Sequence, residues 1–379
     1  MEKTGDGVTH HTRLESLDIL RGFDMFWIVG GASLIISLAG RTEWRWLELL
    51  AEQMYHPEWV GFTFYDLIFP LFMFIVGVAI PYSLISKMEK GVSRIVLLQR
   101  IFRRAVFLVL LGIIYKNNPL PATLAEVRFV SILGQIGVSY MFAAIIFLYI
   151  PSMKAKWIWI FGIMVFIAIL QQFVPVPGYG TAGLSDPAGT INAWLDRTLL
   201  PGRLAYGGGT WDALGPLCTI SSVSVTLMGG VAGTLLRDGN PASTRKAIIL
   251  GAIGTVLVLI ALILAPVYPV IKKAWTPTYS LLTGGMSFML LALFYYFIDV
   301  LKWTGGYAGK VAFFFKVIGM NAITIYMADQ LIQWNYTSGY LLGWLEVYWG
   351  GTWMVIIGAI ILKWLMLYYL YKNKIFLRL

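Results

Sequence analysis

This chain of 379 residues contains one cysteine, three histidines and only 13% charged side chains. The single cysteine, Cys218, excludes an internal disulfide and a metal site built from cysteines. The scarcity of charge excludes a soluble globule of this length, because 58% of the residues are hydrophobic and the mean hydropathy is +0.74. The composition therefore predicts a membrane protein.

Long apolar runs make up most of the sequence. A bilayer core about 30 Å thick needs roughly 20 apolar residues per helical span, and the chain has about ten such runs. None alternates polar and apolar residues as the strands of a membrane barrel do. We therefore expect an all-α polytopic membrane protein, a single transmembrane domain over 1–379, with spans near 17–40, 60–86, 95–115, 131–150, 157–173, 211–236, 247–271, 279–301, 311–332 and 350–371.

Basic residues lie in alternate connections between these spans. They cluster after the second span and recur at Lys154 and Lys156, at Arg245 and Lys246, and near the C-terminus. The positive-inside rule assigns these connections and both termini to the cytoplasm. The formal net charge of +10 follows from this bias and indicates no nucleic-acid partner. The outer loops are then 41–59, 116–130, 174–210, 272–278 and 333–349, which in a bacterium face the periplasm from the inner membrane.

One histidine lies at the start of an apolar helix. His56 precedes Pro57 in "QMYHPEWVGFTFYDLIFPLFMFIVG" and stands ten positions before Asp66. Ten residues of continuous helix extend about 15 Å, which excludes a contact. Pro57 disfavours such a helix, so residues 53–58 can fold back and bring the imidazole to Asp66. A carboxylate bonded to one ring nitrogen leaves the other as a base, so the pair is a candidate for catalysis.

Ionisable residues inside the spans need a partner or a function, because each costs about 2.5–3.5 kcal/mol at a helix centre. In the first span Asp18, Arg21 and Asp24 recur every three residues. Arg21 can pair with either carboxylate on one side of the helix. The group is therefore either an ion-pair staple between helices or a polar wall of a cofactor pocket.

Three arginines, Arg100, Arg103 and Arg104, lie at the cytoplasmic entry of the third span. Such clusters meet lipid headgroups or hold phosphates bidentately, and the sequence leaves both interpretations open. Other polar residues of the spans and of the loops beside them can be helix caps or interhelical hydrogen bonds when each is taken alone. They are Arg128, Gln135, Asp212, Trp275, Tyr279, Ser280 and Asn321.

Taken together, several segments resemble the heparan-α-glucosaminide N-acetyltransferase family of multi-span membrane enzymes. The most specific pieces are the stretch from His56 into "GFTFYDLIFPLFMFIVGVAI" and the stretch "WTPTYSLLTGGMS". The resemblance is completed by "RLESLDILRGF", "RFVSILGQIGVSY", "WDALGPLCT" and "GMNAITIY". It extends over residues 13–371, nearly the whole chain.

The resemblance implies that acetyl-CoA binds from the cytoplasm and that its acetyl group passes through the bundle to the amine of a glucosamine-type sugar, as in heparan sulfate. It implies that His56 is catalytic, as general base or transient acetyl carrier, with Asp66 as its partner. The expected cofactor-binding residues are Arg100, Arg103, Arg104, Asp18, Arg21 and Gln135. The expected substrate-binding residues are Asp212, Trp275, Tyr279, Ser280, Asn321 and Arg128, with Asn321, Ser280 and Arg128 as candidate oxyanion donors.

Alternatives to this interpretation concern the acceptor and the activity itself. We expect no counterpart of the large lumenal extension of the animal enzymes, so the acceptor can be another amino sugar or a hydroxyl. No metal is expected, and a homodimer is left open. A proton-coupled transporter for amino sugars would use Asp18, Asp24 and Asp66 instead. A structural membrane subunit would use none of these residues.

Overall fold

The computed structural model describes residues 14–179, 183–238, 242–303, 305–345 and 351–377. Apart from two isolated bridges, regular structure in these residues is helical. The elements, with η for 3-10 or π turns, are α1 (Glu15–Phe26), η1 (Trp27–Gly31), α2 (Ala32–Ala39), α3 (Arg45–Glu52), α4 (Phe64–Ile80), η2 (Pro81–Ile85), α5 (Ser86–Glu89), α6 (Arg94–Lys116), η3 (Leu124–Glu126), α7 (Ile132–Tyr149), α8 (Met153–Phe173), α9 (Ile191–Leu199), α10 (Pro216–Arg237), α11 (Thr244–Leu264), α12 (Pro277–Tyr295), η4 (Tyr296–Val300), α13 (Gly306–Met320), α14 (Ala322–Leu331), α15 (Trp334–Leu342) and α17 (Trp353–Lys372).

The predicted class, an all-α polytopic membrane protein, is confirmed. In the described part of the chain, eight helices are long and apolar enough to cross a membrane, or nine if the bent pair α13 and α14 is one span. These correspond to all the predicted runs except 95–115. That run is α6, whose 23 residues extend about 35 Å, although its basic side chains lower its mean hydropathy.

The predicted span 311–332 is not one continuous helix. It divides at Asn321 into α13 and α14, which are bent by 70°. Asn321 has non-helical angles, φ −129° and ψ 36°. Its side-chain amide donates to the Ile375 carbonyl at 3.1 Å and its oxygen accepts from Leu377 N–H at 3.4 Å. Binding to backbone elsewhere competes with continuation of the helix.

Three predicted outer loops contain short helices that are too brief to register as spans. α3 lies within 41–59, α9 within 174–210 and α15 within 333–349. α9 begins where the Thr190 hydroxyl accepts a hydrogen bond from Ala193 N–H at 3.1 Å. The longest loop is therefore a partly helical layer over one end of the bundle.

The core of the bundle is the pair α4 and α10, the two most buried spans. Their backbones approach so closely that a Cβ on Gly77 would lie 2.0 Å from the Thr226 carbonyl oxygen, and one on Gly229 would lie 2.0 Å from that of Phe74. Small residues permit this approach between helices in a membrane. α4, which carries Asp66, is therefore held rigidly.

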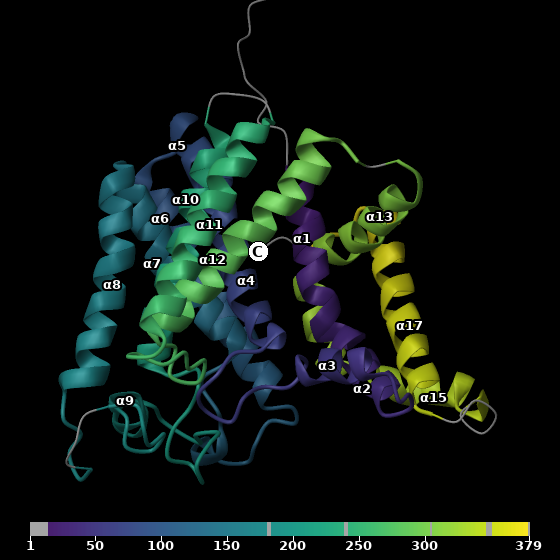
Figure 1. Cartoon of the computed structure of the whole chain (residues 1–379), viewed down its shortest axis with the longest axis horizontal. Helices are drawn as coiled ribbons and strands as arrows, with labels where there is room; N and C mark the ends of the chain where they lie inside the picture. Colours follow the sequence, from purple (N-terminus) through teal and green to yellow (C-terminus); the bar gives the residue numbers. More distant parts are fainter. Residues whose placement is uncertain (1–13, 180–182, 239–241, 304, 346–350, 378–379) are drawn as a thin grey trace, which may run out of the picture.

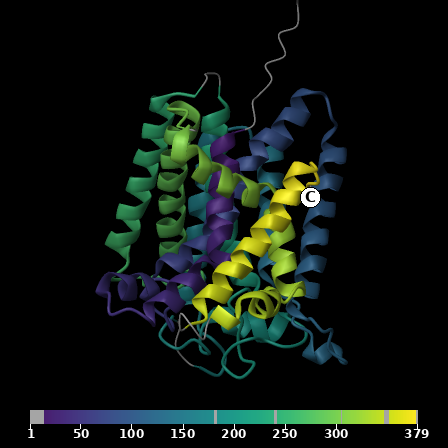
Figure 2. The ribbon, with the colours of Figure 1, turned by 90° about the vertical axis from the view of Figure 1, so that its right-hand side faces the viewer.

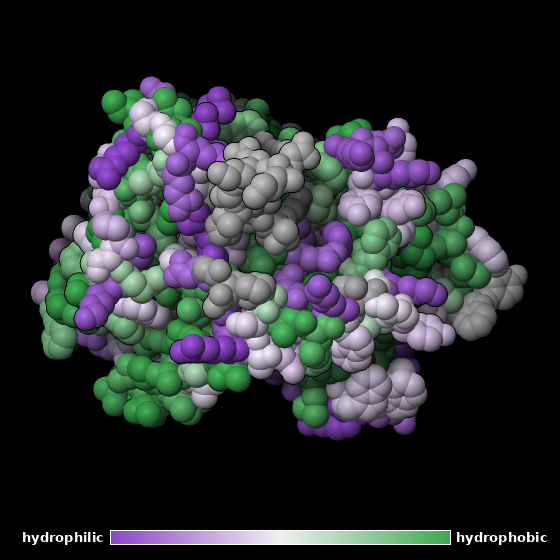
Figure 3. Space-filling view, turned by 90° about the horizontal axis from the view of Figure 1, so that it is seen from above, coloured by the Kyte–Doolittle hydropathy of each residue, from purple (hydrophilic) through white to green (hydrophobic). Residues whose placement is uncertain are grey.

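The arginines of α6 and the residue His56 lie toward opposite ends of the bundle. α5 lies at the upper end, whereas α3, α9 and α15 lie at the lower end (Figure 1). α17 rises from the lower end across one face of the bundle (Figure 2). Seen from above, hydrophilic residues are spread across the upper end (Figure 3). The arginines of α6 follow α5 in the chain, whereas His56 precedes α4 at the lower end. Which end faces the cytoplasm stays a prediction.

Candidate functional site

His56 and Asp66 are in contact, as the fold-back of residues 53–58 predicts. His56 Nδ1 lies 2.6 Å from Asp66 Oδ1. The carboxylate is fully buried, whereas the imidazole is 42% exposed. A buried acceptor on Nδ1 orients the ring and directs Nε2 away from the carboxylate. The pair has the arrangement of a base with a fixed tautomer.

The start of α4 fixes the position of the carboxylate. Asp66 Oδ2 accepts hydrogen bonds from Thr63 N–H at 3.1 Å and from the Thr63 hydroxyl at 3.3 Å. Together with the Thr63 side chain this forms a capping box, and its sequence signature is the acidic residue three positions after threonine. Oδ2 of Asp66 thus caps the start of α4, whereas Oδ1 contacts His56.

Two aromatic residues that the sequence analysis assigned to the substrate support Asp66 from behind. The Tyr279 hydroxyl donates to the Asp66 backbone carbonyl at 2.8 Å. Trp275 packs edge to face against Tyr279, with 5.3 Å between ring centroids. Tyr279, Trp275 and Ser280 are all at most 1% exposed. Tyr279 and Trp275 thus lie behind Asp66, and Ser280 follows Tyr279 in the buried part of α12.

Lys272 completes the cluster and was missed by the sequence analysis. Its Nζ lies 3.1 Å from Asp66 Oδ1, and 3.2 and 3.3 Å from His56 Nδ1 and Nε2. Burial lowers the pKa of the Lys272 ammonium, and the Asp66 carboxylate opposes that shift. The sequence contained a signal for a functional role of this residue. Lys272 and Lys273 are cations in a predicted outer loop, where the positive-inside rule expects few basic residues.

His56 and Lys272 border a cavity of about 210 Å³ inside the bundle, called here the apolar cavity. Its other polar residues are Tyr65 and Tyr326. The remaining lining is hydrophobic: Met25, Ile28, Ile68, Phe69, Phe72, Ile132, Leu133, Ile136 and Ile323. The side chains of His56 and Lys272 thus border a mostly hydrophobic space.

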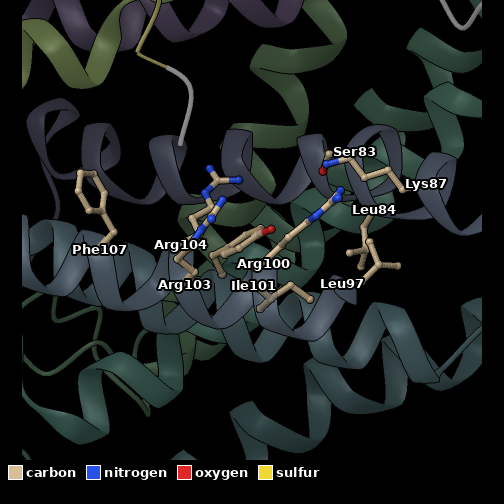
Figure 4. A pocket seen from close by; sticks show the side chains of 10 residues that line it. Ser83, Leu84, Lys87, Leu97, Arg100, Ile101, Arg103, Arg104 and Phe107 are labelled. Carbon is tan, nitrogen blue, oxygen red and sulfur yellow. The ribbon is translucent and has the colours of Figure 1, made fainter. Parts of the chain in front are cut away.

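The arginine cluster borders a second cavity of about 370 Å³, called here the basic cavity. Figure 4 shows the Arg100 side chain extending toward Ser83. The Arg104 guanidinium lies over the Tyr140 ring, 4.2 Å from its centroid. Its buried Nε has no hydrogen-bond partner among the described residues. The lining is Ser83, Leu84, Lys87, Leu97, Arg100, Ile101, Arg103, Arg104, Phe107 and Tyr140.

The two cavities meet the same face of α7. Ile136 lines the apolar cavity, and Tyr140 lines the basic cavity. Residues four apart on a helix share a face and are separated by about 6 Å along its axis. The basic cavity and the apolar cavity therefore follow one another along α7.

The remaining predicted cofactor residues lie outside the basic cavity. Asp18 Oδ1 pairs with Arg21 Nη1 at 3.2 Å within α1. Gln135 is buried, and its amide donates to the Cys218 carbonyl at 3.2 Å. These contacts match the structural interpretation of each residue, as an ion pair or an interhelical hydrogen bond. No group of three or more metal-ligating side chains occurs in the described part of the chain.

Arg128 and Asp212 form a separate buried pair in the outer layer. Arg128 Nε and Nη2 donate to the two Asp212 oxygens, both at 2.8 Å. Asp212 N–H donates to Asp196 Oδ2 at 2.9 Å. Burial raises the pKa of Asp196 to about 7, the hydrogen bond from Asp212 lowers it, and the Asp212 charge raises it. The guanidinium is thus bound to Asp212 bidentately.

The chain is similar to one family model and to curated proteins. A family model described as a domain of unknown function (DUF5009) matches residues 13–175. Heparan-alpha-glucosaminide N-acetyltransferase of Mus musculus is 26% identical over 378 residues, covering 86% of this chain and 54% of the relative. The Homo sapiens protein of the same name is 27% identical over 375 residues, covering 86% and 53%.

The chain is a distant relative of heparan-alpha-glucosaminide N-acetyltransferase. The resemblance seen in the sequence is therefore confirmed. The chain spans about half the length of the curated relatives that it matches.

Proposed function

We propose that this protein is a transmembrane acetyltransferase that moves acetyl from cytoplasmic acetyl-CoA to the amine of a glucosamine-type sugar on the outer side. The observation that carries the proposal is the order in which two cavities and the His56–Asp66 pair follow one another along the bundle. A basic cavity comes first, an apolar cavity follows one helical turn away on α7, and the His56–Asp66 pair borders the latter. The relatives' printed activity supports the same reaction.

The two cavities suit the two parts of coenzyme A. Its phosphates are anionic, and guanidinium groups bind phosphate oxygens through charge-assisted, bidentate hydrogen bonds. Arg100, Arg103 and Arg104 provide them, and the unpartnered Nε of Arg104 is a further donor. The uncharged acetyl-pantetheine arm suits an apolar space. The arm would then present its thioester to His56.

His56 acts as the general base in this proposal. Its Nδ1–H is held by Asp66, so Nε2 can take a proton from the acceptor amine as nitrogen attacks the thioester carbonyl carbon. The carbon–sulfur bond then breaks, and the proton passes from His56 to the thiolate. General base catalysis of this kind contributes about 10²–10⁴-fold. Transient acetylation of His56 is the alternative route, and a trapped acetyl-enzyme formed without acceptor would favour it.

In the cell this arrangement requires the upper, arginine-bearing end to face the cytoplasm. We propose a single transmembrane domain with its lower loops outside, which in a bacterium means the inner membrane and the periplasm. Accessibility of a cysteine introduced at Glu58, next to the site, tests this in intact cells. Labelling by an impermeant maleimide is expected, and labelling only after lysis would reverse the orientation.

The proposal is tested by transfer of radiolabelled acetyl from acetyl-CoA to glucosamine by the purified protein in detergent. Wild type is expected to transfer, and His56→Ala to lose transfer while keeping acetyl-CoA affinity, because the arginines are untouched. If neither glucosamine nor other amino sugars accept acetyl and acetyl-CoA does not bind, the proposal fails. Substrate uptake driven by a proton gradient would then favour the transporter.

A further inference from the structure

An acyl transfer at His56 needs a group that stabilises the oxyanion. The three side chains predicted for this role are placed elsewhere. Arg128 donates to Asp212, Asn321 donates to the Ile375 carbonyl, and Ser280 is fully buried outside the lining of the apolar cavity. The donor must therefore be sought among the residues that line the cavity with His56.

Lys272 meets this requirement. It is the only lysine or arginine among the described residues that line the apolar cavity. Its Nζ lies 3.3 Å from His56 Nε2, the nitrogen left free by Asp66. A carbonyl attacked by an amine that is bonded to Nε2 therefore lies close to this ammonium. We propose that Lys272 is the oxyanion-stabilising residue of the site, an inference that rests on the proposed function.

The surrounding charges favour this role. Asp66 Oδ1 lies 3.1 Å from Lys272 Nζ and stabilises the ammonium in a buried setting. The same carboxylate oxygen lies 2.6 Å from His56 Nδ1, so one buried anion positions both the imidazole and the ammonium. The charged or titratable side chains that contact the ring are Asp66 and Tyr65 of α4, and Lys272.

The chemical step balances without a proton from Lys272. The amine nitrogen forms a bond to the thioester carbon, and the carbonyl π electrons move to oxygen, where the ammonium stabilises the negative charge. The carbonyl then reforms, and the carbon–sulfur bond breaks with its electron pair leaving on sulfur. His56 carries the proton from the amine to the thiolate. Lys272 stays charged throughout.

Lys273 provides a matched control in the adjacent position. Its Nζ donates to the Glu58 carbonyl at 2.5 Å, and it does not line the apolar cavity. Lys272→Met is expected to lower kcat by about 10²–10³-fold, as for loss of an oxyanion donor, with acetyl-CoA affinity unchanged. Lys273→Met is expected to keep kcat within about twofold of wild type, because this lysine does not line the cavity that contains the reacting groups.

A second measurement does not depend on turnover. Isothermal titration with acetyl-CoA reports whether each variant keeps a folded basic cavity, which neither Lys272 nor Lys273 lines. Lys272→Met should bind acetyl-CoA within about twofold of wild type, because the oxyanion forms only during the chemical step. The charge-preserving Lys272→Arg should bind equally well and recover part of the kcat lost in Lys272→Met.

The outcomes separate this inference from the function on which it rests. An active wild type, with equal rates in Lys272→Met and Lys273→Met, would overturn the inference alone. A rate lost in Lys272→Met together with acetyl-CoA binding would mean that Lys272 only supports the fold, and would also overturn it. A wild type without acetyltransferase activity on any amino sugar would overturn both.

Discussion

His56 Nδ1 lies 2.6 Å from Asp66 Oδ1, although the two residues stand ten positions apart on either side of a helix start. Gln53 makes the contact possible, because its side chain and carbonyl accept the first free N–H groups of α4, from Phe64 at 3.1 Å and Tyr65 at 3.0 Å. The loop is thereby tied back over the helix end. A half-exposed imidazole is held against a fully buried carboxylate.

Asp66→Asn is expected to lower kcat by about 10²-fold or more, because an amide cannot stabilise the imidazolium that forms during proton transfer. Binding of acetyl-CoA should not change, since the arginines lie at the other end of the bundle. Isothermal titration with acetyl-CoA and steady-state kinetics separate the two effects. A fully active Asp66→Asn protein would remove the His–Asp pair from the mechanism.

Arg103→Ala with Arg104→Ala is expected to raise the KM for acetyl-CoA by about tenfold or more, because two charge-assisted contacts to phosphate are lost. The effect on kcat should be smaller. Arg94→Ala is the control, because Arg94 lies on the same helix but packs 5.5 Å from the Tyr149 ring, outside the basic cavity. An unchanged KM in the double variant would assign the cluster to lipid headgroups.

Arg128→Met is expected to destabilise the protein by about 3–5 kcal/mol, the typical cost of leaving a buried charge unpaired. The partner Asp212 is fully buried, and the Arg128 side chain is 13% exposed. Thermal unfolding in detergent measures the loss. The double variant with Asp212→Asn should recover part of it, and a double variant less stable than Arg128→Met would contradict the buried pairing.

Asp196 is expected to make stability depend on pH. Its folded-state pKa of about 7 lies above the unfolded value of about 3.9, so the folded state holds the proton more tightly. The stabilisation of the folded state by the protonated Asp196 is therefore complete below about pH 4 and is lost as the pH rises to about 7. Asp196→Asn should remove this dependence, because an amide does not titrate.

Melting temperatures of wild type and Asp196→Asn between pH 4 and 8 measure this contribution. The variant should gain stability relative to wild type as the pH rises. Parallel curves for the two proteins would show that Asp196 ionises normally in the folded state.

Composition and local pattern determined the class and most spans of this protein. Apolar runs long enough to cross a bilayer can bury their backbone polar groups only as helices, so their lengths predict the helices closely. Pro57 is likewise a local signal, and it predicted the break before α4. The capping box of Thr63 and Asp66, seen in the structure, has a local sequence signature too. The His–Asp contact followed from these short-range rules.

Tertiary structure decided which side chains meet. Lys272 reaches His56 across 216 positions of sequence, and Arg128 reaches Asp212 across 84. The bend at Asn321 depends on the carbonyl of Ile375, 54 positions away. The adjacency of the basic and apolar cavities depends on how α4, α6 and α7 pack. Periodicity reports only neighbours along the chain, whereas these contacts arise when helices distant in sequence bury their polar groups against one another.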